Sequence, residues 1–393
     1  MKSLVLNIVI LTALYLFPSS CQQSRGDLPC IDVSKNHPEK EILLTDIADI
    51  TYLLLSSDND EYLYRGGIRA ITENVVVIVD HKDGTVLFFD RNGQPKSRFN
   101  HRGNGPKEYR NIHRLLYDED TDEVFVTSYY SPIILVYNSF GEYKREFESP
   151  TGTRIGNEVV SFDDTSIFFY DVSIEGKRFD MDFKNLPKSD LVSSFYRISK
   201  SDGAVLDCVE LMMNPIFLGI SNDGNIVSGN VKRMVQSSEG VYLCNPENDT
   251  VFLYNKSQFI TPVLHKTPLV SATTPMTYLN NCVDVGNYQF MQIFSVKREE
   301  GAFPFPAKYY MLDKSTGKVV KPILHLTDFV GNEFVIDVYK MLFTGKETLI
   351  YFELDNIELK QAYAEKKLNG KLKELVATLK EDDNNIYVMA QFK

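Results

Sequence analysis

Residues 86–99 read VLFFDRNGQPKSRF and contain two short strand-like runs joined by a polar turn. The first run is aliphatic and aromatic, a composition that favours β-strands. In the turn, Asp90 and Asn92 can hydrogen-bond to their own backbone, and Gly93 accepts a positive φ without a steric clash. The stretch therefore predicts a β-hairpin.

The same unit of aromatic strand, polar turn and second strand recurs four more times. The later copies begin at residues 134–137, 195–198, 251–254 and 309–312, and only the copy at 251–254 lacks a turn glycine. One or two further strand-like runs precede each hairpin. Four strands in a recurring unit are the pattern of a β-propeller blade, so the repeats predict five blades.

A sixth blade can be assembled from the two ends of the chain. Residues 347–353 and 385–392 are strand-like, and residues 40–55 supply another extended segment. A ring closed by pairing N- and C-terminal strands leaves no open sheet edge. We therefore expect an all-β fold, a six-bladed β-propeller over residues 40–393. Residues 67–71 and 225–228 are its expected inner strands.

Residues 355–380 depart from the strand pattern and predict a short helical insertion in the last blade. Asp355 is placed as an N-cap with Glu358 three residues later, as in a capping box. Apolar residues follow at helical spacing: Leu368, Leu372, Leu375, Val376 and Leu379. Gly370 divides the segment into two helices. We expect the apolar face to pack on the propeller; docking of a partner is the alternative.

The N-terminus has the features of a secretory signal. A positive start at Lys2 is followed by a mostly apolar run over residues 4–17 and by small residues before Cys21. This pattern predicts a signal peptide over residues 1–20, lipidation of Cys21 and a tether over residues 21–39. The expected location is the cell envelope, with a lipid anchor in the outer membrane or on its periplasmic face. Secretion without a lipid is the alternative.

The formal charge of −11 opposes nucleic-acid binding, which requires a basic surface. Four further cysteines lie at positions 30, 208, 244 and 282, and no C-x-x-C pair suggests structural zinc. Export permits disulfides. Because Cys208 and Cys244 lie in strand-like runs, we favour buried free thiols over disulfides.

Residues 101–109, HRGNGPKEY, resemble the G-x-G-P-x-E-Y segment of six-bladed β-propeller lipoproteins from Bacteroides and relatives, a family similar to NHL-repeat and TolB-type propellers. Residues 42–55, 89–93 and 381–385 resemble that family's opening strand, F-D-x-x-G turn and C-terminal ending. Most of its members have no assigned activity. The resemblance therefore implies a fold and an envelope location, but no chemistry.

The same segment supplies the candidate ligand-binding residues. Its glycines could allow backbone amides to approach an anion, with basic side chains assisting. The candidates are His101, Arg102, Lys107, Glu108, Tyr109 and Arg110. The alternative, which we favour, is a tight inter-blade loop in which Tyr109 packs against a neighbouring blade.

No catalytic residue, metal ligand or cofactor is predicted. No two histidines have metal-ligand spacing, and the acidic run at residues 118–122 lacks the central Gly and final Glu of a calcium-binding hand. Two functional classes stay open. The favoured one is a binding or scaffold module that presents a propeller face to a glycan, peptide or envelope protein. The other is a propeller enzyme, a metal-dependent lactonase-like hydrolase or a lyase, acting on the central channel.

Overall fold

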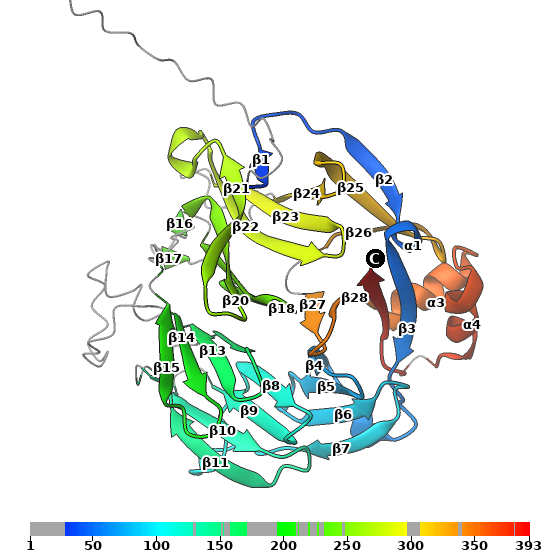
Figure 1. The fold of residues 1–393 in the computed structure, drawn as a ribbon. Coiled ribbons are helices and arrows are strands. Elements are labelled where there is room, and N and C mark those ends of the chain that lie inside the picture. The colour runs from blue at the N-terminus through cyan, green and yellow to red at the C-terminus, as the bar shows by residue number, and fades with distance from the viewer. Residues whose placement is uncertain are drawn as a thin grey trace, which may run out of the picture.

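The computed structural model describes residues 28–393 except 129–130, 151, 153–157, 171–194, 210, 212–218, 221–225, 228–231, 246–247, 297–306, 337–339 and 381. The described strands form antiparallel sheets arranged in a ring about a central axis (Figure 1). Four of the contacts between neighbouring sheets are made by their first strands, so these strands lie next to the central channel. The predicted all-β propeller class is confirmed.

We name each sheet after its innermost strand. Three sheets follow one another along the chain, each with strands that pair in order from the channel outward. The β4 sheet contains β4 (Gly66–Ile71), β5 (Val75–Asp80), β6 (Val86–Asp90) and β7 (Pro95–Phe99). The β8 sheet contains β8 (Arg114–Asp118), β9 (Glu123–Thr127), β10 (Ile133–Tyr137) and β11 (Tyr143–Glu148). The β12 sheet contains β12 (Glu158–Ser161), β13 (Ser166–Tyr170), β14 (Phe195–Ser199) and β15 (Val205–Val209).

The next two sheets carry additional strands at their outer edges. The β18 sheet contains β18 (Met234–Ser237), β19 (Gly240–Asn245), β20 (Thr250–Asn255), β21 (Ile260–Thr267) and, outermost, β1 (Cys30–Asp32). The β22 sheet contains β22 (Met276–Val285), β23 (Tyr288–Val296), β24 (Ala307–Asp313) and β25 (Lys318–Leu326), with β2 (Glu39–Leu43) and β26 (Phe329–Phe334) both paired to β25.

The two ends of the chain meet in the last sheet. It contains β27 (Met341–Phe343), β28 (Thr348–Leu354), β29 (Ile386–Phe392) and, outermost, β3 (Ala48–Leu54). Strands β29 and β3 pair in antiparallel register from Ile386 opposite Leu54 to Phe392 opposite Ala48. The predicted pairing of N- and C-terminal strands is confirmed.

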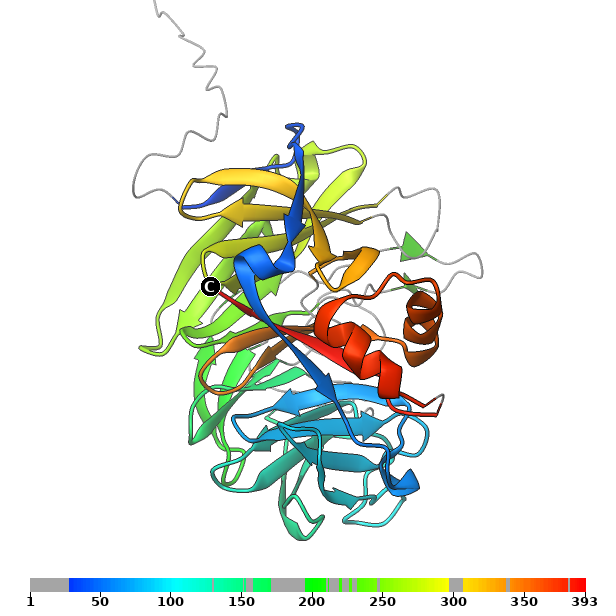
Figure 2. The same ribbon diagram turned by 90° about the vertical axis from the view of Figure 1, so that its right-hand side faces the viewer.

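The N-terminal segment is more divided than the sequence suggested. Residues 40–55 do not form one extended segment, because the short helix α1 (Leu44–Ile47) separates β2 from β3. Leu44 and Ile47 are buried, which explains the turn inward at this point. Strands β1 and β2 pair in parallel with β21 and β25, so the segment covers the outer edges of three consecutive sheets (Figure 2).

The expectation of an inner strand at residues 225–228 was wrong for residues 226 and 227, and residues 225 and 228 lie outside the described residues. Residues Ile226–Val227 form β17, which pairs only with β16 (Gly219–Ile220) in a separate two-stranded sheet. The inner strand of that part of the ring is β18, whose Met234 and Val235 are buried. The aliphatic pair Ile226–Val227 resembles a strand in the sequence, but β18 is the strand whose side chains are buried between the sheets.

The predicted helical insertion between β28 and β29 is confirmed as two helices. Helix α3 (Asn356–Ala364) begins after Asp355, whose carboxylate accepts hydrogen bonds from the backbone N–H groups of Ile357 and Glu358. Helix α4 (Gly370–Thr378) follows. The insertion buries apolar side chains against the rest of the core: Leu359, Ala362, Leu368, Leu372, Val376 and Leu379.

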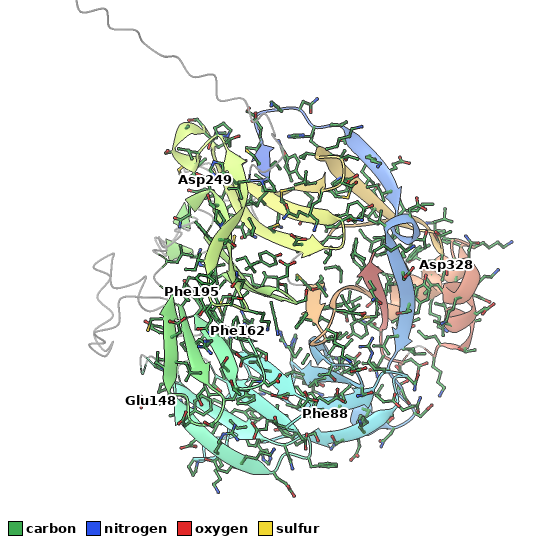
Figure 3. The ribbon with its side chains drawn as sticks, in the orientation of Figure 1. Phe88, Glu148, Phe162, Phe195, Asp249 and Asp328 are labelled. Carbon is green, nitrogen blue, oxygen red and sulfur yellow. The ribbon has the colours of Figure 1, made fainter. Side chains whose placement is uncertain are left out.

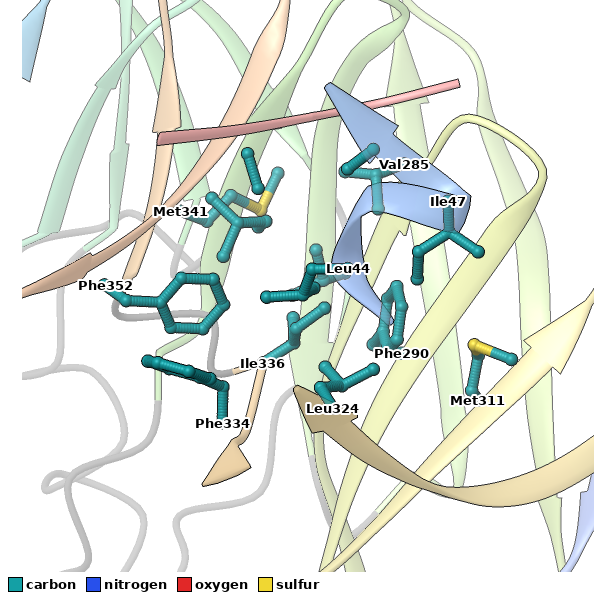
Figure 4. Packing of buried hydrophobic residues seen from close by; sticks show 14 of the residues in the cluster. Leu44, Ile47, Val285, Phe290, Met311, Leu324, Phe334, Ile336, Met341 and Phe352 are labelled. Carbon is teal, nitrogen blue, oxygen red and sulfur yellow. The ribbon is translucent and has the colours of Figure 1, made fainter. Parts of the chain in front are cut away.

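Apolar packing fills the spaces between the sheets. Leu44 and Ile47 of α1 lie among Phe290, Leu324 and Ile336 in the largest buried cluster (Figure 4). Aromatic rings fill the other interfaces, as Phe88 and Phe162 illustrate (Figure 3). These contacts fix the inner strands and hence the side chains at the channel.

Candidate functional site

Tyr109 anchors the 101–110 segment between two sheets. It is 1% exposed, and its hydroxyl donates to the Gly84 carbonyl at 2.8 Å and accepts the His101 N–H at 3.0 Å. Its ring lies edge-on to Tyr137 of the next sheet, at 6.2 Å between centroids. The expected inter-blade loop, with Tyr109 against a neighbouring blade, is confirmed.

The glycine-rich part of the loop is filled by its own carboxylate. The Glu108 side chain accepts the Gly105 N–H at 2.8 Å, and a Cβ placed on Gly103 would lie 1.9 Å from a Glu108 oxygen. His101 stacks on Tyr137 at 5.2 Å and 15°. A negative group thus occupies the space in which a bound anion would meet these amides.

The basic candidates of the loop also contact the protein. Arg102 donates to the Lys82 carbonyl at 3.1 Å, and the Lys107 ammonium lies 4.5 Å from the Tyr143 ring centre. Arg110 is exposed. The structure therefore brings the six candidate residues together in one loop, and their role in ligand binding stays a prediction.

A different group of polar side chains gathers at the channel. It begins with a β-bulge in the inner strand β4, where Ile68 pairs with Ile78 and Ala70 with Val77, so that Arg69 is left without a partner in the register. Bulges change the direction of a side chain and often occur near functional sites. Arg69 Nη2 lies 2.7 Å from His81 Nε2, and no carboxylate of a described residue lies within ion-pair distance of Arg69.

Glu158 connects the next three sheets around the channel. One carboxylate oxygen lies 3.9 Å from Arg114 Nη2. The other accepts the backbone N–H groups of Arg233 at 3.2 Å and Met234 at 3.3 Å. Burial raises the pKa of Glu158, and the charges of Arg114, Lys232 and Arg233 oppose that rise.

Like charges are crowded at this position. Burial lowers the pKa of the Arg69 guanidinium, and the neighbouring Arg114 charge lowers it further. Burial, followed by Arg114 and Arg69, lowers the pKa of His113 to about 4. Burial and Arg69 also lower the pKa of His81, against the attraction of Asp80 and Glu353. The imidazoles are therefore neutral near pH 7 while the guanidinium groups are charged.

Two more cations extend the group around the channel. The Arg233 guanidinium lies 6.0 Å from the Tyr170 ring centre, and the Lys340 ammonium lies 5.2 Å from that of Tyr351. Tyr351 in turn interacts with the charge of Arg69. We call the whole set the channel cluster: Arg69, His81, His113, Arg114, Glu158, Lys232, Arg233 and Lys340. The set contains five cations and the Glu158 carboxylate, with the carboxylates of Asp80 and Glu353 close to His81. This excess of cations favours binding of an anion.

Sequence reasoning missed the channel cluster because its members come from distant parts of the chain. One signal was present. A basic residue begins β8 at Arg114, and basic residues immediately precede β18 at Arg233 and β27 at Lys340. The sequence alone does not show that these three basic residues lie close together, because that depends on which strands surround the channel.

The cysteines divide into several environments. Cys244 and Cys282 are buried free thiols, as predicted, and burial raises the pKa of Cys244 to about 12. Cys208 is exposed, so its expected burial was wrong: β15 is the outermost strand of its sheet. Cys30 is disulfide-bonded.

Among the described residues, no three His, Cys, Asp or Glu side chains are grouped so that they could hold a metal ion. No helix in the described part of the chain is long and apolar enough to span a bilayer. Residues 1–20 and Cys21, to which the signal peptide and lipidation were assigned, lie outside the described residues.

Solved structures match this chain at low sequence identity. An exported protein of Bacteroides fragilis has a TM-score of 0.61 at 14% identity, over 93% of this chain and 100% of that one. A DUF4221-family member from Bacteroides vulgatus has a TM-score of 0.49 at 12% identity, over 88% and 97%. Virginiamycin B lyase from Staphylococcus aureus has a TM-score of 0.38 at 13% identity, over 88% and 100%.

No curated protein matches the sequence. One family model covers nearly all of the described chain, from residue 28 to residue 391. Since that match spans far more than half of the sequence, the chain belongs to the family described as "Domain of unknown function (DUF4934)".

Proposed function

We propose that this protein is a lipid-anchored binding module of the cell envelope, a six-bladed propeller that takes an anionic ligand at the channel cluster. The blade number is supported by the sheets: six have four or more strands, and first strands are in contact from β27 through β4, β8 and β12 to β18. The envelope location is supported by the signal-like N-terminus and by the similarity in fold to an exported Bacteroides protein.

Arg69 is the observation that carries the anion proposal. It lies on a bulge at the channel edge, has no acidic partner among the described residues and is crowded by Arg114. A carboxylate or phosphate between the two guanidinium groups would remove their repulsion and form charge-assisted hydrogen bonds. Glu158 cannot fully supply this charge, because its other oxygen is held by two backbone N–H groups.

Isothermal titration calorimetry with inorganic phosphate and with citrate tests the anion site. We expect binding by the wild type and a loss of about tenfold or more in Arg69→Ala, since hydrogen bonds to charged groups contribute about 1.5–3 kcal/mol. Arg98→Ala is the matched control, because Arg98 pairs with Glu61 on the exposed edge strand β7. Equal affinity in Arg69→Ala and the wild type, or no binding of either anion, would overturn the proposal.

Lipidation of Cys21 has its own test. A lipid thioether consumes the Cys21 thiol, so the lipidated protein cannot contain a disulfide between Cys21 and Cys30. The proposal therefore requires that the Cys30 disulfide is absent from the lipidated protein. Mass spectrometry of the N-terminal peptide from membranes should show a diacylglyceryl adduct, and Cys21→Ala should release the protein from the membrane fraction. Unchanged membrane retention of Cys21→Ala would refute the anchor.

A propeller enzyme acting at the same cluster is the second candidate, either a metal-dependent lactonase-like hydrolase or a lyase. His113 with its lowered pKa and Glu158 with its raised pKa provide two groups suited to proton transfer beside cationic side chains. Elemental analysis of purified protein distinguishes the hydrolase: stoichiometric divalent metal favours it, and metal-free protein with full anion binding favours the binding module.

A further inference from the structure

A cavity of about 390 Å³ lies at the other end of the channel from the channel cluster. It is bordered by Glu73 in the turn after β4 and by residues 344–347 in the turn after β27. The channel cluster, in contrast, lies where the inner strands begin, at Arg114, Arg233 and Lys340. The cavity is therefore separate from the proposed anion site.

The interior of this cavity combines apolar and hydrogen-bonding groups. Leu349 and Met389 are buried side chains that line it. Thr51, Thr344 and Gln391 add uncharged donors and acceptors. Its volume is at the lower end of the range of about 300–1,000 Å³ that is typical of small-molecule sites. It suits a compact ligand with one apolar part.

Two opposite charges line the cavity without pairing. Arg91 donates to the Thr72 carbonyl at 2.9 Å, yet neither Arg91 nor Glu347 forms an ion pair with any described residue. Their charges nevertheless interact: burial lowers the pKa of Arg91, and the charge of Glu347 raises it. The two residues come from neighbouring sheets, in the turns after β6 and β27.

The remaining charges of the cavity already have partners. The Lys346 ammonium lies 2.6 Å from the Glu73 carboxylate, and Asp49 lies 3.3 Å from the Lys393 ammonium. Arg91 and Glu347 are therefore the two charged groups of this lining that are available to a ligand. A ligand that fits both must carry an anion and a cation.

We propose that this cavity binds a small zwitterion with an apolar side chain, such as a free aliphatic amino acid or a dipeptide. Its carboxylate pairs with the half-buried Arg91, whose guanidinium forms fork-like bonds with carboxylates. Its ammonium pairs with Glu347, and its side chain packs against Leu349 and Met389, where removal of the ligand's own apolar surface from water adds affinity. The assignment does not depend on the anion site at the channel cluster.

Calorimetric titration with three related probes tests this assignment on the folded full-length chain. L-leucine carries both charges, N-acetyl-leucine lacks the ammonium, and leucinamide lacks the carboxylate. We expect L-leucine to bind, and each derivative to bind about tenfold or more weakly, because each loses one charge-assisted contact. Equal affinity for the three probes, or no heat with L-leucine at millimolar concentration, would overturn the proposal.

Two variants assign the charges to residues. Arg91→Met should reduce the affinity for L-leucine to that for leucinamide and leave leucinamide itself unaffected. Glu347→Gln, at an exposed position, should reduce the affinity for L-leucine to that for N-acetyl-leucine. Lys96→Gln, at an exposed position outside the lining, is the control and should change nothing. If L-leucine binds but neither variant weakens it, the assignment is wrong. Unchanged melting temperatures confirm that the variants remain folded.

Discussion

His81 Nε2 lies 2.7 Å from Arg69 Nη2, and this contact holds a cation at the channel edge without neutralising it. Because burial and Arg69 itself lower the pKa of His81, the imidazole stays neutral and accepts a hydrogen bond from the guanidinium. The bulge at Arg69 places the side chain and His81 orients it. The pair is thus prepared for an anion, which none of the described carboxylates supplies at ion-pair distance from Arg69.

His81 should act as a positioning residue for Arg69. His81→Leu removes the acceptor and should weaken binding of inorganic phosphate severalfold, because the guanidinium loses its fixed orientation. His81→Gln supplies a neutral amide oxygen as acceptor and should restore most of the affinity. Phosphate titrations of both variants check this, and a His81→Gln variant as weak as His81→Leu would contradict the positioning role.

Acidification should destabilise the fold through His113. In the unfolded chain this imidazole takes up a proton below about pH 6.5, whereas in the native protein its pKa is about 4. Between these values the unfolded state binds more protons, so stability falls as the pH decreases through that window. Melting temperatures measured from pH 7 to pH 4 should decline less in His113→Gln than in the wild type. Equal declines of the melting temperature in His113→Gln and the wild type would show that groups other than His113 cause the loss of stability at acidic pH.

Tyr109→Phe should destabilise the contact between the β4 and β8 sheets. The substitution removes the hydroxyl that donates to Gly84 and accepts from His101, leaving both backbone groups without that partner. Loss of buried hydrogen-bond partners costs about 1–3 kcal/mol. Urea denaturation gives the free energy of unfolding, with the surface variant Tyr363→Phe on α3 as control. A change no larger than that of the control would exclude an anchoring role for Tyr109.

Lys266→Met should be strongly destabilising. Lys266 and Asp249 form a buried ion pair at 2.6 Å, with exposed fractions of 0% and 4%. Removing one member leaves an uncompensated buried charge, at a cost of about 3–5 kcal/mol. The double variant Asp249→Asn/Lys266→Met should recover part of that loss, because both charges are then absent. Additive losses in chemical denaturation would show that the two side chains act independently.

Ring closure should depend on β3 more than on β1. Removal of residues 1–55 deletes β3 together with β1, β2 and α1 and exposes the edge of β29, so we expect no cooperative unfolding transition. Removal of residues 1–37 deletes only β1 from the described strands and should leave a folded ring with a lower melting temperature. Calorimetry of both chains makes the comparison, and a normal transition without β3 would contradict closure by the chain ends.

The hairpins were predictable because their turn chemistry is local. Asp90 and Asn138 accept backbone N–H groups within their own turns, and Gly93 and Gly141 adopt a φ of +83°. The closing strands were predictable from their strand-like composition and from the need to leave no open sheet edge. The parallel additions β1 and β2 were not, because pairing at an outer edge leaves no distinctive local pattern.

The channel cluster was less accessible to sequence reasoning. Arg69 is directed by a bulge, and a bulge depends on the register between β4 and β5. The approach of Arg114 to Glu158 depends on contact between two sheets. The 101–110 segment stood out in the sequence for another reason: its glycines and Tyr109 build an inter-sheet loop, and conspicuous composition there reflects packing.

The most direct test of the anion site is the position of a bound anion. Crystals of the protein soaked in selenate would locate the anion by the anomalous scattering of selenium. The account predicts a selenium peak beside the Arg69 guanidinium, close enough for a selenate oxygen to accept a hydrogen bond from it, and loss of that peak in Arg69→Ala. Selenate bound only on the outer surface, with the channel cluster unoccupied at saturating concentration, would contradict it.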